Sequence, residues 1–92
     1  MQFEWDENKN DQNLSKHAID FADAHLIFEK PLLTRVDDRF DYGEKRWIGL
    51  GKLDTVIVVV VFTKRRDRIR IISIRKANKQ ERSIYNEKVY EN

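Results

Sequence analysis

The stretch TVIVVVVFTKRRDRIRIISIRK, residues 55–76, decides the fold because it contains two long strand patterns joined by a tight turn. The run 56–62 is apolar on both faces, which is typical of a strand in the middle of a sheet. The charged residues 64–67 predict a tight turn into a second strand over residues 68–75. These two strands are expected to be antiparallel neighbours.

The alternation of the second strand slips once. Ile69 and Ile71 alternate with arginines, whereas Ile72 and Ile74 take the arginine parity. A β-bulge near residues 71–72 would restore one polar face, because bulges re-aim side chains and are common beside functional sites. That face would carry Arg68, Arg70, Ser73 and Arg75. The alternative is a regular strand that is buried on both faces beyond Ile71, in which Arg75 simply lies at the end of the strand.

In the N-terminal part of the chain, the sequence predicts a brief extended segment at residues 3–5 and then two short helices. Asp6 is a good N-cap for a helix that runs to about residue 16. That helix is strongly polar, and its only aliphatic anchors are Leu14 and Ala18. Asp20 is expected to cap a second, amphipathic helix, which the single proline ends.

After that proline, the period of the apolar residues changes from about 3.6 to 2. Residues 33–38 and 46–50 are predicted strands, and a turn near residues 52–54 leads into the central strand. A C-terminal helix is expected after residue 76. Its predicted packing face is Ala77, Ile84, Tyr85 and Val89. The fold class is α+β, a small antiparallel sheet flanked by two N-terminal helices and one C-terminal helix, in a single domain of residues 1–92.

Length and composition limit the function. A chain of 92 residues forms one domain, and its small core favours a partner protein that covers part of the surface. The absence of cysteine excludes disulfides, thiolate metal sites and a cysteine nucleophile. His17 and His25 cannot form a zinc site alone, and no apolar run reaches the roughly 18–20 residues of a membrane span. We therefore expect a cytoplasmic protein without metal, cofactor or membrane association.

The net charge of +2 hides a strong asymmetry along the chain. Residues 1–44 hold five basic and eleven acidic side chains, whereas residues 45–92 hold thirteen basic and five acidic ones. Nine lysines and arginines lie within residues 64–82, a density typical of a phosphate-binding surface. A solvated basic face without a ligand is the alternative interpretation.

Three motifs of this sequence resemble the BrnT family of bacterial type II toxins. They are W-D-x-x-K-x-x-x-N-x-x-K-H over residues 5–17, E-x-R over residues 44–46, and R-I-I-S-x-R-K-A over residues 70–77. The resemblance runs from about residue 3 to residue 85. Two positions depart from the family pattern, because Ala18 stands where the family usually has Gly and Ile74 where it often has Ala. Neither departure removes a group that could do chemistry.

The resemblance implies a RelE-like fold and a ribonuclease that cleaves RNA and so inhibits translation and growth. It also implies a BrnA-like antitoxin with a ribbon-helix-helix domain. In that family, two toxins and two antitoxins assemble, and the complex binds operator DNA. The alternative function is a non-catalytic nucleic-acid-binding or scaffold module, because the sequence has no dense catalytic signature such as paired histidines.

Metal-independent RNA cleavage uses the neighbouring 2′-hydroxyl as nucleophile, so the protein must move protons and stabilise charge on the phosphate. Arginine suits the second task because its planar group binds phosphate oxygens through two donors. We expect Arg70 and Arg75, with Arg46 across the sheet, to bind the phosphate. Ion pairing with the acidic N-terminal half is the alternative role of these arginines.

For proton transfer we expect His17, because an imidazole exchanges protons near neutral pH and the end of a helix favours its charged form. Its alternative role is to cap the last carbonyls of the helix. Tyr85 and Glu44 are lesser catalytic candidates, since a tyrosine can simply pack and a glutamate can orient an arginine. The expected contacts to backbone phosphates are Lys9, Lys16, Lys76 and Arg68.

Overall fold

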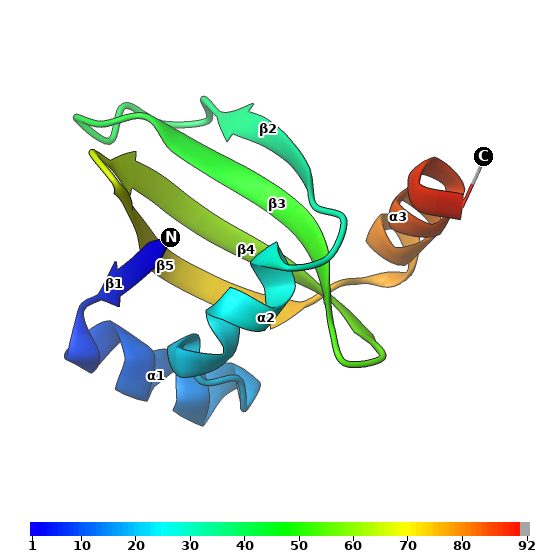
Figure 1. Cartoon of the computed structure of the whole chain (residues 1–92), viewed down its shortest axis with the longest axis horizontal. Coiled ribbons are helices and arrows are strands. Elements are labelled where there is room, and N and C mark those ends of the chain that lie inside the picture. The colour runs from blue at the N-terminus through cyan, green and yellow to red at the C-terminus, as the bar shows by residue number, and fades with distance from the viewer. Residues whose placement is uncertain (91–92) are drawn as a thin grey trace.

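The computed structural model describes residues 1–90 and contains one five-stranded sheet with helices on both of its faces (Figure 1). The strands are β1 (Gln2–Trp5), β2 (Leu33–Asp37), β3 (Arg46–Leu53), β4 (Val56–Arg65) and β5 (Arg68–Lys76). The helices are α1 (Glu7–His17), the 3₁₀ helix η1 (Phe21–Asp23), α2 (Ala24–Phe28) and α3 (Lys79–Tyr90). The predicted α+β class, with its N-terminal helices and its C-terminal helix, is confirmed.

The strand order is β1-β5-β4-β3-β2, and one pairing differs from the antiparallel sheet that was expected. Strands β2 to β5 are antiparallel to their neighbours, but β1 runs parallel to β5, with Gln2 opposite Arg68 and Trp5 opposite Ile71. The sheet is therefore mixed. A parallel pair needs a long crossover connection, and here α1, η1, α2 and the three other strands all lie between the two paired segments.

The bulge predicted in β5 is present. Val61 pairs with Ser73 and Phe62 pairs with Ile71, so Ile72 has no partner residue on β4. This extra residue restores the alternation, because successive strand residues point to opposite faces. As predicted, Arg68, Arg70, Ser73 and Arg75 share one face of β5.

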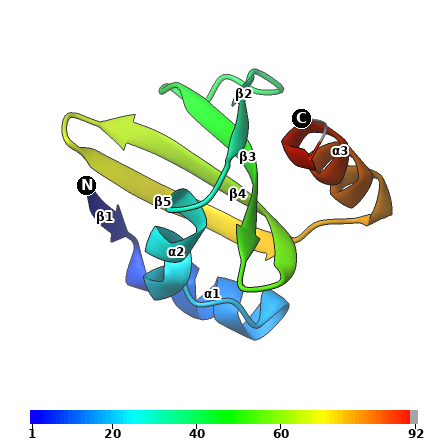
Figure 2. The ribbon, with the colours of Figure 1, turned by 45° about the vertical axis from the view of Figure 1, so that its right-hand side comes forward.

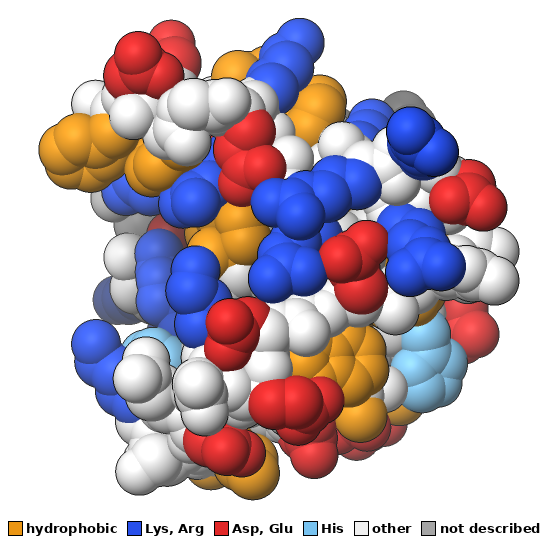
Figure 3. All heavy atoms as spheres, turned by 90° about the vertical axis from the view of Figure 1, so that its left-hand side faces the viewer, with side chains coloured by type: hydrophobic (Ala, Val, Ile, Leu, Met, Phe, Trp, Pro, Cys, Tyr) orange, Lys and Arg blue, Asp and Glu red, His pale blue; other side chains and the backbone are white. Residues whose placement is uncertain are grey.

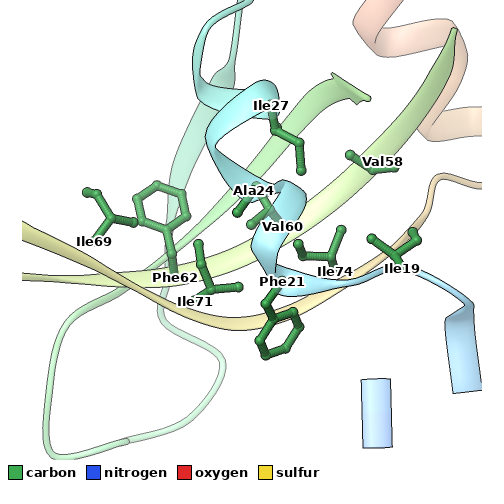
Figure 4. Packing of buried hydrophobic residues seen from close by; sticks show 10 residues of the cluster. All are labelled: Ile19, Phe21, Ala24, Ile27, Val58, Val60, Phe62, Ile69, Ile71 and Ile74. Carbon is green, nitrogen blue, oxygen red and sulfur yellow. The ribbon is translucent and has the colours of Figure 1, made fainter. Parts of the chain in front are cut away.

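The larger hydrophobic core lies between the sheet and the helices η1 and α2 (Figure 4). In this core, the Phe62 ring packs edge-on against Phe28, with centroids 5.1 Å apart, and stacks on Trp47 at 6.1 Å. Each fully buried aliphatic or aromatic side chain contributes about 1.5–3 kcal/mol to stability. The core residues are Ile19, Phe21, Ala24, Ile27, Val58, Val60, Phe62, Ile69, Ile71 and Ile74.

Helix α1 is anchored by asparagines and not by the aliphatic residues that were expected. Leu14 is 43% exposed and Ala18 is exposed, whereas Asn10 and Asn13 are buried. Both asparagines use their side chains to bind other segments of the chain. A hydrophobic pattern does not reveal such anchors, because they depend on backbone groups far along the chain.

Helix α3 covers one end of the opposite face over a smaller core (Figure 2). This core contains Ile57, Val59, Ala77 and Tyr85, with Leu33, Ile48, Leu50 and Val89 packed against it. Of the four residues predicted to form the packing face of the C-terminal helix, three belong to this smaller core or pack against it, but Ile84 is 41% exposed. Figures 1 and 2 show α3 near the end of the sheet where β5 finishes, so none of the helices in the described part of the chain covers this face where β5 begins. Within residues 1–90, no helix has the length and apolar character that crossing a bilayer requires.

Candidate functional site

We use the term polar face for the face of the sheet opposite η1 and α2, where several arginines and a serine lie. Trp47 packs on the larger core, so its neighbour Arg46 points to the polar face. The bulge brings the polar side chains of β5 to the same face. The polar face therefore carries Arg46, Arg68, Arg70, Ser73 and Arg75.

Arg70 and Arg75 both form ion pairs in this structure. The Nη1 atom of Arg70 donates to Oε2 of Glu4 on β1 at 2.8 Å. Arg75 donates to both carboxylate oxygens of Glu81 on α3, each at 2.9 Å. This double hydrogen bond raises the pKa of Arg75 and lowers the pKa of Glu81. The alternative role of ion pairing is thus present, although the partner of Arg75 lies in the C-terminal helix and not in the acidic N-terminal half.

These ion pairs leave both arginines accessible. The side chain of Arg70 is 28% exposed and that of Arg75 is 42% exposed. Exposed ion pairs contribute only about 0–1 kcal/mol, because water solvates both charges when they separate. A phosphate group can therefore reach either guanidinium and compete with its carboxylate partner.

Arg46 is held by an aromatic ring. Its guanidinium carbon lies 4.1 Å from the centroid of the Tyr42 ring, and its Nε atom lies 3.6 Å from Oε2 of Glu44. That Nε atom is buried and has no hydrogen-bond partner among the described residues. Glu44 also accepts a hydrogen bond from Arg65 at 3.0 Å, so it orients two arginines, which is the alternative role expected for it.

Asp37 fixes the loop that supports Arg46. It accepts hydrogen bonds from Nε and Nη2 of Arg39 at 2.8 and 3.0 Å, and from the Tyr42 hydroxyl at 2.9 Å. The hydrogen bond from Arg39, together with that from Tyr42, holds the pKa of Asp37 far below its usual value. Neither Asp37 nor Tyr42 is among the predicted site residues, and their only local signal is a dense run of charged and aromatic residues that begins at the end of a predicted strand.

A cleft of about 270 Å³ lies between α1 and β5, and we call it the α1–β5 cleft. Lys9, Lys16 and His17 line it from α1, so both lysines lie on one face of this helix. Ser73 lines the cleft from β5 and belongs to the polar face, between Arg70 and Arg75 along the strand. The remaining lining residues are Gln12, Asn13 and Ile72.

Two predicted site residues lie apart from this group. Lys76 pairs with Val58, a residue of the larger core, so it points to the face opposite Arg75. Tyr85 is only 1% exposed, and its hydroxyl donates to the carbonyl of Pro31 at 2.8 Å. The geometry therefore gives Tyr85 a packing role and separates Lys76 from the arginines.

The end of the molecule at the β4–β5 turn is basic. Lys64, Arg65, Arg66 and Arg68 lie in or beside this turn. Figure 3 shows basic side chains gathered across the middle of this end, with acidic side chains between them. A polyanion that reaches the polar face from this end meets favourable charge on its way.

Together, these elements offer guanidinium, ammonium, hydroxyl and imidazole groups to a ligand. Paired guanidinium donors suit phosphate oxygens, and an imidazole transfers protons near neutral pH. Within residues 1–90, no three His, Cys, Asp or Glu side chains are grouped so that they could hold a metal ion. These are the types of group that phosphodiester binding and proton transfer require.

Similarity to a known protein family shows which class of protein this chain belongs to. Residues 5–81 match the family described as "Ribonuclease toxin, BrnT, of type II toxin-antitoxin system". No curated protein matches the sequence closely enough to be significant. The family match spans α1, η1, α2, strands β2 to β5 and the start of α3, and thus the polar face and the α1–β5 cleft. Because the match covers well over half of the sequence, this chain belongs to the BrnT family of ribonuclease toxins of type II toxin-antitoxin systems.

Proposed function

We propose that this protein cleaves RNA at the polar face, by attack of the neighbouring 2′-hydroxyl on the phosphate and without a metal ion. The observation that carries this proposal is the α1–β5 cleft, in which Lys9, Lys16 and His17 lie opposite Ser73. Ser73 stands between Arg70 and Arg75 along β5, so cationic groups from two elements lie around one hydroxyl. This combination suits a phosphodiester better than it suits a neutral ligand.

In the proposed reaction, the 2′-oxygen bonds to phosphorus and the bond from phosphorus to the 5′-oxygen breaks. The 2′-hydroxyl gives its proton to water, and the imidazolium form of His17 protonates the departing 5′-oxygen. Arg70 and Arg75 stabilise the charge that builds up on the non-bridging oxygens, with Arg46 as a third contact. The products are a 2′,3′-cyclic phosphate and a 5′-hydroxyl. Lys9, Lys16 and Arg68 bind the flanking phosphates.

Purified protein incubated with RNA, with and without EDTA, tests this reaction. We expect EDTA to leave cleavage unchanged and the products to end in 2′,3′-cyclic phosphate. A 3′-hydroxyl product that disappears when EDTA is added would refute the mechanism. RNA binding without any cleavage would instead favour the non-catalytic nucleic-acid-binding module.

Substitutions on β5 test the location of the site. Arg70→Ala and Arg75→Ala should each abolish growth inhibition while the circular dichroism spectrum stays that of the folded protein. Lys76→Ala is the matched control, because this residue follows Arg75 directly but points to the other face of the sheet. Full toxicity of a well-expressed double variant, Arg70→Ala with Arg75→Ala, would contradict the assignment of the polar face.

The family implies an antitoxin partner, and we propose a BrnA-like ribbon-helix-helix protein in a complex of two toxins and two antitoxins that binds operator DNA. An acidic or amphipathic segment of this antitoxin would cover the polar face, since a small domain gains both burial and charge neutralisation from such a contact. Hydrogen exchange of the complex should protect the segments around Arg46, Arg70 and Arg75. Protection confined to residues 1–44 would exclude this arrangement.

A further inference from the structure

The outer edge of β5 has two different neighbours. Strand β1 pairs only with residues 68–71 of β5. Beyond them come the bulge residue Ile72 and residues 73–76, which no strand among the described residues covers on that side. Backbone groups at such an edge need other hydrogen-bond partners when they are buried.

The side chain of Asn13 acts as this partner. Its Oδ1 atom accepts a hydrogen bond from the backbone N–H of Ile74 at 3.1 Å, and its Nδ2 atom donates to the carbonyl of the same residue at 2.9 Å. A carboxamide carries the same donor and acceptor as a peptide group, so these two bonds replace one rung of a missing strand. The Nδ2 atom also donates to the carbonyl of Ile19 at 3.0 Å.

Burial makes this contact selective. Asn13 is 7% exposed, and Ile74 is fully buried in the larger core. A buried carboxamide that loses its partners is costly, so Asn13 favours the one register in which Ile74 lies beside it. The apolar side chain of Ile74 favours the same register, and the carboxamide fixes its backbone.

We propose that Asn13 is a positioning residue of the ribonuclease site, because it fixes the register of β5 after the bulge and so aims Ser73 and Arg75 at the polar face. A shift of one residue in a strand turns every side chain to the other face of the sheet. Ser73 and Arg75 flank Ile74 directly, so they depend most on this contact. The inference rests on the proposed function of the polar face.

Asn10 provides a matched control on the same helix. It is 8% exposed, its Nδ2 atom donates to Asp20 at 3.0 Å, and its Oδ1 atom accepts from the backbone N–H of Phe21 at 2.9 Å. These bonds connect α1 to η1 and not to β5. Asn10→Ala and Asn13→Ala should therefore lower the melting temperature to a similar degree, while only Asn13→Ala disturbs the polar face.

The first measurement is hydrogen exchange of the Ile74 backbone amide in the two variants. Relative to the amide of Val60 in the central strand, the Ile74 amide should exchange about tenfold faster in Asn13→Ala than in Asn10→Ala, a factor that corresponds to the loss of one hydrogen bond. Equal relative rates in the two variants would overturn the proposed contact.

The second measurement is the binding of a fluorescein-labelled, single-stranded RNA oligonucleotide that is 2′-O-methylated at every position and so cannot be cleaved. At a temperature where both variants are folded, Asn13→Ala should weaken binding about tenfold, and Asn10→Ala should change it by less than about twofold. Equal weakening by both variants would show that Asn13 acts through general stability alone and would overturn the inference.

A double-mutant cycle separates positioning from other effects of Asn13. If Asn13 acts through Arg75, then adding Asn13→Ala to the Arg75→Ala variant should cost much less affinity than adding it to the wild type. An equal cost in both backgrounds would overturn the positioning role. Failure of the proposed function would look different, because Arg75→Ala alone would then bind the oligonucleotide as tightly as the wild type.

Discussion

Replacing Ala18 by Gly should stabilise the protein. Ala18 follows the last residue of α1 with φ 59° and ψ 29°, and its N–H donates to the carbonyl of Leu14 at 2.9 Å, so the helix end requires this left-handed conformation. A residue with a Cβ atom destabilises the folded state by about 1–2 kcal/mol in this conformation. Glycine relieves this strain, but its greater conformational freedom in the unfolded chain lowers the stability by about 0.4–1 kcal/mol. Ala18 is exposed, so no packing is lost.

These two effects leave a net gain of about 0.8 kcal/mol, which corresponds to a rise in melting temperature of about 3–6 °C for a domain of this size. Thermal unfolding followed by circular dichroism measures this shift. Ala22→Gly is the control, because Ala22 is also exposed but is not among the residues with positive φ, and it should lose about 0.5–1 kcal/mol. A lower melting temperature for Ala18→Gly, or a shift of the same sign in both variants, would refute the reasoning.

Three further predictions follow from contacts described by the structure. A Cβ atom at Gly51 would lie 2.6 Å from Cγ2 of Ile27, so Gly51→Ala should cost about 1–3 kcal/mol in urea unfolding, and an unchanged midpoint would contradict this. Because the folded-state pKa of Asp37 lies below its usual value of 3.8, this carboxylate stabilises the fold above pH 3.8 and loses its effect as the pH falls further. Asp37→Asn should therefore be less stable than the wild type at pH 6, and the difference should shrink below pH 3.8; a constant difference down to pH 2 would argue against it. Glu81→Gln removes the partner of Arg75 and should tighten binding of the uncleavable oligonucleotide by up to about fivefold, whereas weaker binding would count against competition between Glu81 and phosphate.

Strand β5, which carries three of the site arginines, could be predicted in detail because a bulge interrupts the alternation of apolar and polar residues in the sequence. Ile71 and Ile74 both lie in the larger core although three positions separate them, and this spacing is visible in the sequence. The direction of β1 could not be predicted in the same way. Four alternating residues fit a parallel and an antiparallel neighbour equally well, and only contacts such as Glu4 with Arg70, 66 residues apart, distinguish the two.

The residue types in the sequence identified the cationic side chains of the candidate site, but they did not indicate which other groups surround them. The sequence did contain the signal that separates Lys76 from Arg75, because Lys76 stands two positions after the core residue Ile74 and so shares its face. The burial of Asn13 had no such local signal. An asparagine on a polar helix is expected in solvent, and its burial depends on the backbone of a strand 61 residues away.

The pairing of β1 with β5 also determines when the polar face can exist during synthesis. A ribosome adds about 5–20 residues per second from the N-terminus, so β1 and α1 leave it well before β5. Until residues 68–76 have been made, β4 lacks one of its two neighbouring strands, Asn13 has no strand to bind, and the larger core lacks three isoleucines. A nascent chain that stops short of β5 therefore has no complete polar face. The cell that makes this protein is exposed to an assembled site only once most of the chain has been synthesised.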